Sequence, residues 1–214
     1  MTAPEMQYSF QSKLQGLGYD PEFIDTYRIQ FLLNEAQGDF VDRYAPFIDV
    51  DDVAKNKLIT LINTGVVIPS AYDATNNIST YSYFATLPSG YRKILNEWLI
   101  ESVGGRTIIV KPISYDEYNI EKLNPFKKPY APSATESGLA WRLIYGASNS
   151  RKAELIVDST TASAVGQTFS YKLRYITNPS AIDIFAGTAC LLNATDHEEI
   201  VNIAISLLPT LKTK

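Results

Sequence analysis

Strict alternation of apolar and polar residues marks the clearest strand in the chain, over residues 169–175. A period of two places alternate side chains on opposite faces of a sheet, so this strand is predicted to lie in an antiparallel sheet with one face exposed. Shorter apolar runs predict further strands. These runs cover residues 107–110, 139–145, 154–158, 182–185 and 189–192.

Turn residues divide the strand-rich part of the chain. Gly104 and Gly105 separate an apolar run ending at Val103 from the run at 107–110, which predicts a tight hairpin. Residues 66–89 mix short β-prone pieces with turn residues such as Asn76–Asn77, and we predict an irregular segment containing one or two strands.

Apolar residues spaced by three and four predict helices before and between the strands. The first is expected from an N-cap at Asp20, with Pro21 at its first position, to Tyr44. A second begins with Asp49 as its cap and stops at Asn63–Thr64–Gly65, and a short third one carries a capping box of Ser114 and Glu117. The core stripe of the first helix is Ile29, Leu33, Ala36, Phe40 and Tyr44.

The last predicted helix is apolar almost all round. Thr195 and Glu198 suggest a capping box at its start, and Pro209 lies beyond its end. Only Asn202 and Ser206 interrupt its apolar surface, so the helix must be covered on both sides, either within the chain or by a neighbouring subunit.

Together these elements predict an α+β fold. We expect an antiparallel sheet or sandwich with N-terminal helices and the C-terminal apolar helix packed against it. Residues 1–18 lack a firm period and end in Gly16–Leu17–Gly18, which predicts a flexible N-terminal arm. Residues 19–214 are then a single domain with an extended proline-rich loop at 123–138.

Composition narrows the possible functions. The chain has 14 tyrosines and 12% aromatic residues, which favours extended protein contacts, because tyrosine combines an apolar ring with a hydroxyl that tolerates water. A net charge of −4 with scattered basic residues argues against a protein that grips nucleic acid. No apolar run is long enough to cross a bilayer, so we expect a soluble chain made in a reducing cytoplasm.

The inventory of reactive side chains predicts no enzyme, cofactor or metal site. The only histidine, His197, stands between acidic residues at a predicted helix start, and the single cysteine, Cys190, lies in an apolar run. Neither a nucleophile elbow nor a phosphate-binding glycine loop is present. A paired-carboxylate glycoside hydrolase stays open as a remote alternative, because two facing acids leave no short motif.

The chain resembles a family of virion structural proteins from crAss-like and related tailed phages that infect Bacteroidetes. The resemblance spans residues 20–208. It is carried by Phe31-Leu32-Leu33-Asn34-Glu35-Ala36-Gln37, Phe40-Val41, Leu87-Pro88, Asn124-Pro125-Phe126-Lys127-Lys128-Pro129, Leu173-Arg174-Tyr175-Ile176, Asn178-Pro179 and His197-Glu198-Glu199-Ile200-Val201.

The resemblance implies a head-to-tail connector or adaptor in the neck or tail of the virion, made in the host bacterial cytoplasm. Such a subunit forms a homo-oligomeric ring, with twelve copies as one candidate number, between the portal and neighbouring ring proteins. DNA would pass through the lumen without specific binding. Phe126 either tucks onto its own sheet or docks on another chain. Lys127 and Lys128 face solvent, a phosphate backbone or an acidic partner. The candidate subunit-contact residues are Asn124, Pro125, Phe126, Lys127, Lys128, Pro129 and Tyr130.

The main alternative is a carbohydrate-binding or receptor-binding β-domain of a virion, in which exposed tyrosines would stack on sugar rings.

Overall fold

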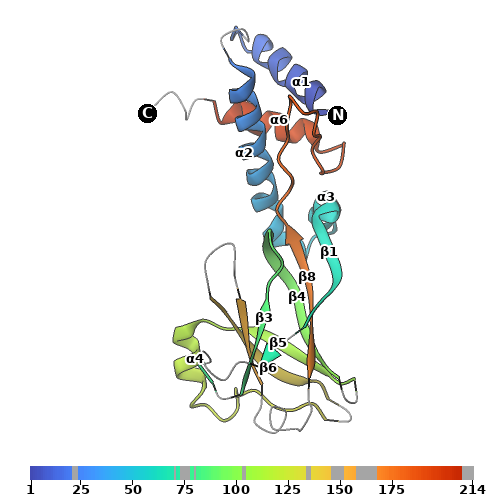
Figure 1. The fold of residues 1–214 in the computed structure, drawn as a ribbon. Coiled ribbons are helices and arrows are strands. Elements are labelled where there is room, and N and C mark those ends of the chain that lie inside the picture. Colours follow the sequence, from blue (N-terminus) through green and yellow to red (C-terminus); the bar gives the residue numbers. More distant parts are fainter. Residues whose placement is uncertain are drawn as a thin grey trace. The chain divides into compact units, whose positions relative to one another are not determined.

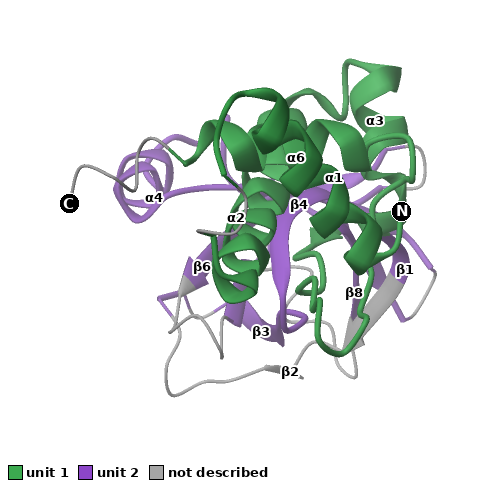
Figure 2. Cartoon of the chain, turned by 90° about the horizontal axis from the view of Figure 1, so that it is seen from above, with its two compact units in different colours: residues 1–62, 176–214 green, residues 63–175 purple. Residues whose placement is uncertain are grey.

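The computed structural model describes residues 1–20, 24–69, 71–72, 78–79, 81–102, 105–133, 136–145, 152–157 and 168–208. The chain divides into two compact units, coloured separately in Figure 2. Unit 1 combines residues 1–62 with 176–214, and unit 2 comprises residues 63–175. This differs from the single domain expected over 19–214, because the second unit is inserted between the two halves of the first.

Unit 1 is built from helices, which Figure 1 colours blue to cyan and red. The helix α6 packs on α1 and α2, whereas the predicted packing of this helix against the sheet is not confirmed. The helices are α1 (Ala3–Gly16), α2 (Thr26–Tyr44), α3 (Asp52–Leu58) and α6 (His197–Ser206), with 3-10 turns η2 (Ala45–Phe47) and η3 (Ile59–Leu61).

The helix α1 stands where the sequence interpretation expected a flexible arm over residues 1–18. Thr2 and Glu5 form a reciprocal capping box, in which the Glu5 carboxylate accepts from the Thr2 N–H at 2.8 Å. Met6, Phe10 and Leu14 recur every four residues and are buried. A capped start and an apolar stripe therefore make this segment a packed helix.

The helices α2, α3 and α6 begin a few residues after the predicted positions. The predicted stripe of α2 from Ile29 to Phe40 is buried, but Pro21 lies outside the described residues. The cap of α3 is Asp51 rather than Asp49, because the Asp51 carboxylate accepts from the Val53 N–H at 2.9 Å. The helix α6 begins after Asp196, so the predicted Thr195 cap is wrong. Pro209 lies outside the described residues.

The segment before α6 runs along α2 without forming the strands expected at 182–185 and 189–192. A single antiparallel bridge joins Asp183 to Thr188. Side-chain amides of α2 bind the backbone instead: Gln30 accepts from the Ile184 N–H at 3.0 Å, and Gln37 donates to the Ser180 carbonyl at 3.0 Å. Side chains of α2 thus form hydrogen bonds with backbone groups that a neighbouring strand would otherwise pair.

Unit 2 is formed around a curled sheet (Figure 1). The order of its strands is β1-β8-β4-β5-β6-β7-β3-β2. Strands β2 and β3 lie within the stretch 66–89, which was expected to hold one or two strands, and β1 begins before that stretch, at Ile62. Asn76 and Asn77 lie outside the described residues. The strands are β1 (Ile62–Pro69), β2 (Ala71–Tyr72), β3 (Ser82–Thr86), β4 (Tyr91–Glu101), β5 (Thr107–Pro112), β6 (Gly138–Tyr145), β7 (Lys152–Ile156) and β8 (Phe169–Thr177).

The registers confirm the hairpin and add a parallel pair. Strands β4 and β5 are antiparallel, with Leu99 opposite Ile108, and Gly105 takes a φ of 63° in their turn. Val103 and Gly104 of that prediction lie outside the described residues. Strands β5 and β6 are parallel, with Val110 opposite Ala140. A parallel pair cannot close through a tight turn, so the chain must cross over between them.

Each face of the sheet buries its own apolar cluster. The alternation predicted for β8 is confirmed, since Phe169, Tyr171 and Leu173 all lie in the larger cluster. The smaller cluster contains Trp141 and Leu143 and is covered by α4 (Tyr115–Glu121), whose Tyr118 meets the Trp141 ring edge-on at 6.0 Å. The fold is therefore α+β, as the sequence predicted.

Candidate subunit-contact site

The candidate contact residues lie in the crossover between β5 and β6. The chain leaves β5 at Pro112, forms α4 and returns through the proline-rich loop to β6. The predicted capping box is present, because the Glu117 carboxylate accepts from the Ser114 N–H at 2.8 Å and Ser114 Oγ accepts from the Glu117 N–H. The capping box therefore fixes the start of the helix in this crossover connection between two parallel strands.

A hydrogen-bonded turn presents Phe126 to solvent. The Asn124 side-chain oxygen accepts from the Phe126 N–H at 3.0 Å, and the Asn124 carbonyl accepts from the Lys127 N–H at 3.2 Å. This turn holds the backbone locally. The Phe126 side chain is 96% exposed, so of the two predicted positions it does not tuck onto its own sheet. Pro125, Lys127 and Lys128 are exposed as well.

Two further apolar residues, not among the predicted contact residues, lie close to Phe126 in the chain. Ile120 is 72% exposed and Leu123 is 78% exposed, at the end of α4 and just after it. Their signal in the sequence is an apolar residue on each side of Glu121 and Lys122 in a short polar helix. We call Ile120, Leu123 and Phe126 the apolar knob.

The Glu121 carboxylate, next to Ile120 in the chain, forms ion pairs with two lysines. Glu121 is 8% exposed and accepts from Lys127 at 3.1 Å and from Lys111 at 3.2 Å. The hydrogen bond from Lys127, followed by that from Lys111, keeps the pKa of Glu121 below its usual range. Since Lys111 belongs to β5, this cluster ties the loop to the sheet.

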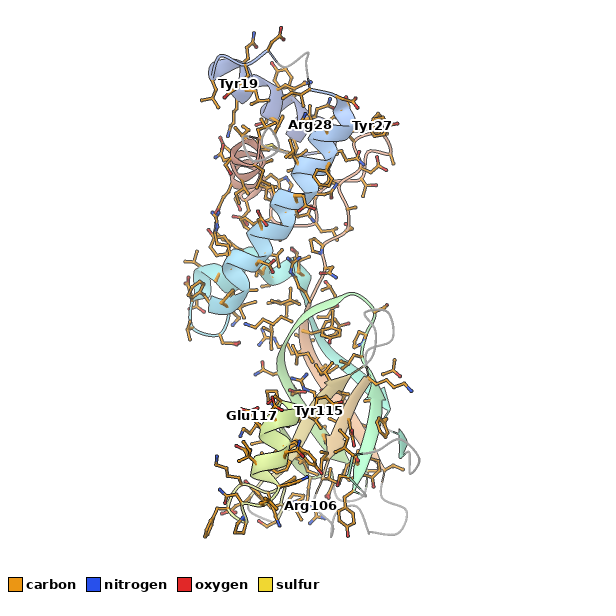
Figure 3. All side chains as sticks on the ribbon, turned by 90° about the vertical axis from the view of Figure 1, so that its left-hand side faces the viewer. Tyr19, Tyr27, Arg28, Arg106, Tyr115 and Glu117 are labelled. Atoms are coloured by element: carbon orange, nitrogen blue, oxygen red, sulfur yellow. The ribbon has the colours of Figure 1, made fainter. Side chains whose placement is uncertain are left out.

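The returning part of the loop is fixed at close quarters to β6. Tyr130 and Leu139 exchange two backbone hydrogen bonds, of 3.1 and 2.9 Å. A Cβ on Gly138 would lie 2.8 Å from both the Tyr130 carbonyl oxygen and the Pro132 nitrogen, so only glycine permits this approach. Arg106, labelled in Figure 3, donates to the Pro132 carbonyl and pairs with buried Glu101. Pro129 is half-buried and Tyr130 is 51% exposed.

Ionisable groups within unit 2 form a buried triad. Arg142 Nε lies 2.8 Å from a Glu97 oxygen, and the Tyr171 hydroxyl donates to the same carboxylate. Burial raises the pKa of Glu97, and Arg142 only partly offsets this effect. Burial also raises the pKa of Tyr171. The triad joins β4, β6 and β8.

The single histidine and the single cysteine are both buried in unit 1. His197 Nδ1 lies 2.9 Å from the Met1 amine, and its Nε2 lies 2.9 Å from the Leu192 carbonyl oxygen. Burial raises the pKa of the Cys190 thiol.

Within the described ranges, no group of three or more histidine, cysteine, aspartate or glutamate side chains could hold a metal ion. None of the described helices has the length and apolar character needed to span a membrane.

No protein-family model matches this chain, and no curated protein matches its sequence.

Proposed function

We propose that the chain is a non-enzymatic structural subunit of an oligomeric ring in the neck or tail of a tailed bacteriophage virion, where it serves as a portal-to-tail connector or adaptor. The observation that carries the proposal is the apolar knob. Its three large side chains are each at least 72% exposed, and they lie at the end of α4 and in the hydrogen-bonded turn that follows it. An exposed, preorganised apolar projection is typical of a protein interface.

Exposed aromatic residues on unit 1 support the same proposal. Tyr8 on α1 is 75% exposed and Tyr27 on α2, labelled in Figure 3, is 67% exposed. Tyr27 lies 4.5 Å from the ring of Phe185, which is itself 58% exposed. Ring subunits contact neighbours on two sides and adjoining rings above and below, and aromatic residues are enriched at such contacts. The net charge of −4 suits a lumen through which DNA passes without binding.

The proposal is tested by measuring mass. The chain is analysed by multi-angle light scattering alone and after co-expression with the products of the genes that flank its own. A closed oligomer of this chain, or its incorporation into a ring with the portal or a neck protein, is expected. A chain that stays monomeric under both conditions and joins no other virion protein would refute the proposal.

A specific pocket favours the carbohydrate-binding alternative. Tyr81, Tyr118 and Trp141 line a cavity of about 290 Å³ in unit 2, with Lys122 and Lys128 at the same cavity. Aromatic rings beside lysine amines suit a sugar. A saccharide array followed by a melting shift, lost in Tyr118→Ala and retained in Tyr8→Ala, would support this alternative over the ring.

A further inference from the structure

We infer that the apolar knob of one copy docks into the pocket beside the start of α4 on a second copy of this chain. This inference rests on the proposed ring and names the contact that would hold neighbouring subunits together.

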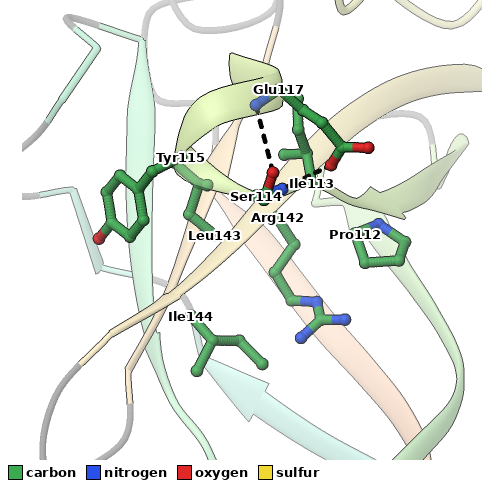
Figure 4. Close-up of a pocket in the computed structure, with 8 residues that line it drawn as sticks. All are labelled: Pro112, Ile113, Ser114, Tyr115, Glu117, Arg142, Leu143 and Ile144. Carbon is green, nitrogen blue, oxygen red and sulfur yellow. Dashed lines mark hydrogen bonds between the residues drawn. The ribbon is translucent and has the colours of Figure 1, made fainter. Parts of the chain in front are cut away.

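The pocket lies beside the first turn of α4, as Figure 4 shows in close-up, whereas the knob lies at the end of that helix and in the turn after it. The pocket has a volume of about 420 Å³. Its walls come from the end of β5, the first turn of α4 and the middle of β6. Its lining includes Pro112, Ile113, Tyr115, Leu143 and Ile144.

Size and chemistry suit an aromatic side chain. An apolar cavity of about 150 Å³ already accepts a benzene ring, so this pocket has room for the phenyl ring of Phe126 and part of Leu123. Ile144 and Tyr115 are 36% and 45% exposed, so they offer apolar surface that their own chain leaves uncovered.

Charge around the two surfaces is complementary. Lys127 and Lys128 directly follow Phe126 and are exposed. Glu117, in the first turn of α4, is exposed and lines the pocket. Hydrogen bonds from Ser114 lower the pKa of Glu117, which keeps it charged at neutral pH. Opposite charges around an apolar centre favour one orientation of docking.

The occupant is a second copy because the two surfaces lie on one chain and differ from each other. Each copy carries a knob at one end of α4 and a pocket at the other, so contact leaves a free knob and a free pocket. Such a heterologous contact adds subunits head to tail and closes into a ring when the rotation allows.

Crosslinking tests the contact directly. In a Cys190→Ala background, Phe126→Cys and Ile144→Cys are carried on separately tagged copies, co-expressed and treated with a short bis-maleimide. We expect crosslinked dimers that carry both tags. The control pairs Phe126→Cys with Val50→Cys, because Val50 is 83% exposed in unit 1 and is outside the inferred contact. Crosslinking no stronger than in the control would overturn the inference.

A substitution gives a second readout. We expect Phe126→Ala to weaken self-association by about thirtyfold or more, as for a central interface residue. Phe31→Ala, at a residue that is 54% exposed on α2, should leave the crosslinking and the mass unchanged. Equal association of both variants would contradict the inference.

The two proposals fail separately. A closed oligomer without the specific crosslink refutes the knob-and-pocket contact and leaves the ring intact. The crosslink in a chain that forms only open or paired species supports the contact and refutes the ring. A monomer without the crosslink refutes both.

Discussion

The side-chain amide of Asn34 forms hydrogen bonds with both the backbone N–H and the backbone carbonyl of Ile182, as a residue in a neighbouring strand would. Asn34 Nδ2 donates to the Ile182 carbonyl at 2.9 Å, and Asn34 Oδ1 accepts from the Ile182 N–H at 2.8 Å. Ile182 is fully buried, so its backbone groups have no access to water. A helix thereby satisfies an extended segment that has no sheet beside it.

Replacing Asn34 by leucine should therefore destabilise unit 1. The variant keeps the volume of the side chain but leaves two buried backbone groups unpaired, at a cost of about 2–4 kcal/mol. Urea unfolding followed by circular dichroism measures the change. Asn202→Leu is the matched control, because Asn202 is exposed on α6, where its side-chain oxygen accepts from Lys13. Equal stability of the two variants would mean that the Asn34 bonds contribute little.

The buried pair of Glu97 and Arg142 should show strong coupling. Their side chains are 6% and 9% exposed, so Arg142→Met leaves an unpaired carboxylate in the interior and should cost about 3–5 kcal/mol. The double variant Glu97→Leu with Arg142→Met removes both charges and should recover much of that loss. A double-mutant cycle in urea measures the coupling, and additive effects would show that the pair is not coupled.

Glu199 should make unit 1 sensitive to acid. Burial opposes its charge, but hydrogen bonds from Lys57 and Tyr44 outweigh this, so the pKa of Glu199 falls below its ordinary value of 4.5. Its contribution to stability is present above about pH 4.5 and is lost as pH falls through the lower folded pKa. Glu199→Gln should flatten the acid limb of the stability profile. Glu198→Gln, whose carboxylate is 66% exposed on the same helix, is the control, and identical profiles would contradict the prediction.

Gly138→Ala should displace the returning part of the proline-rich loop. The new methyl group would meet backbone atoms of Tyr130 and Pro132 at 2.8 Å, and relieving such a clash costs about 1–3 kcal/mol. Thermal unfolding measures the loss. Gly16→Ala, where a Cβ meets nothing within 4 Å, should be neutral or stabilising by up to about 1 kcal/mol. A neutral Gly138→Ala would show that the loop yields without cost.

Local patterns predicted those elements whose partners are close in the sequence. The alternation at Phe169 to Tyr175 gave β8, and Ser114 with Glu117 gave the start of α4. The helix α1 could have been predicted too, since Thr2, Glu5 and the spacing of Met6, Phe10 and Leu14 carry the same kind of signal. Gly16 and Gly18 are typical of a flexible segment, but here they lie at the end of the helix and just after it.

Long-range pairing could not be predicted. Residues 182–185 have the apolar character of a strand, but their backbone partners are amides on α2, nearly 150 residues earlier in the chain. At the candidate site, the prolines predicted a loop, and Phe126 within that loop was a predicted contact residue. The pocket at the other end of α4 combines Tyr115 with Ile144, and only the parallel pairing of β5 with β6 brings those residues together.

The insertion of unit 2 between the two halves of unit 1 sets an order of events during translation. The apolar faces of α1 and α2 emerge from the ribosome before unit 2, yet α6, which packs on both, emerges after it. All of unit 2 is synthesised in the interval and is complete before that helix appears. Synthesis of unit 1 begins before unit 2 and is completed after it, so nascent chains carry uncovered apolar surface throughout the synthesis of unit 2, and chaperones have a defined period in which to bind it.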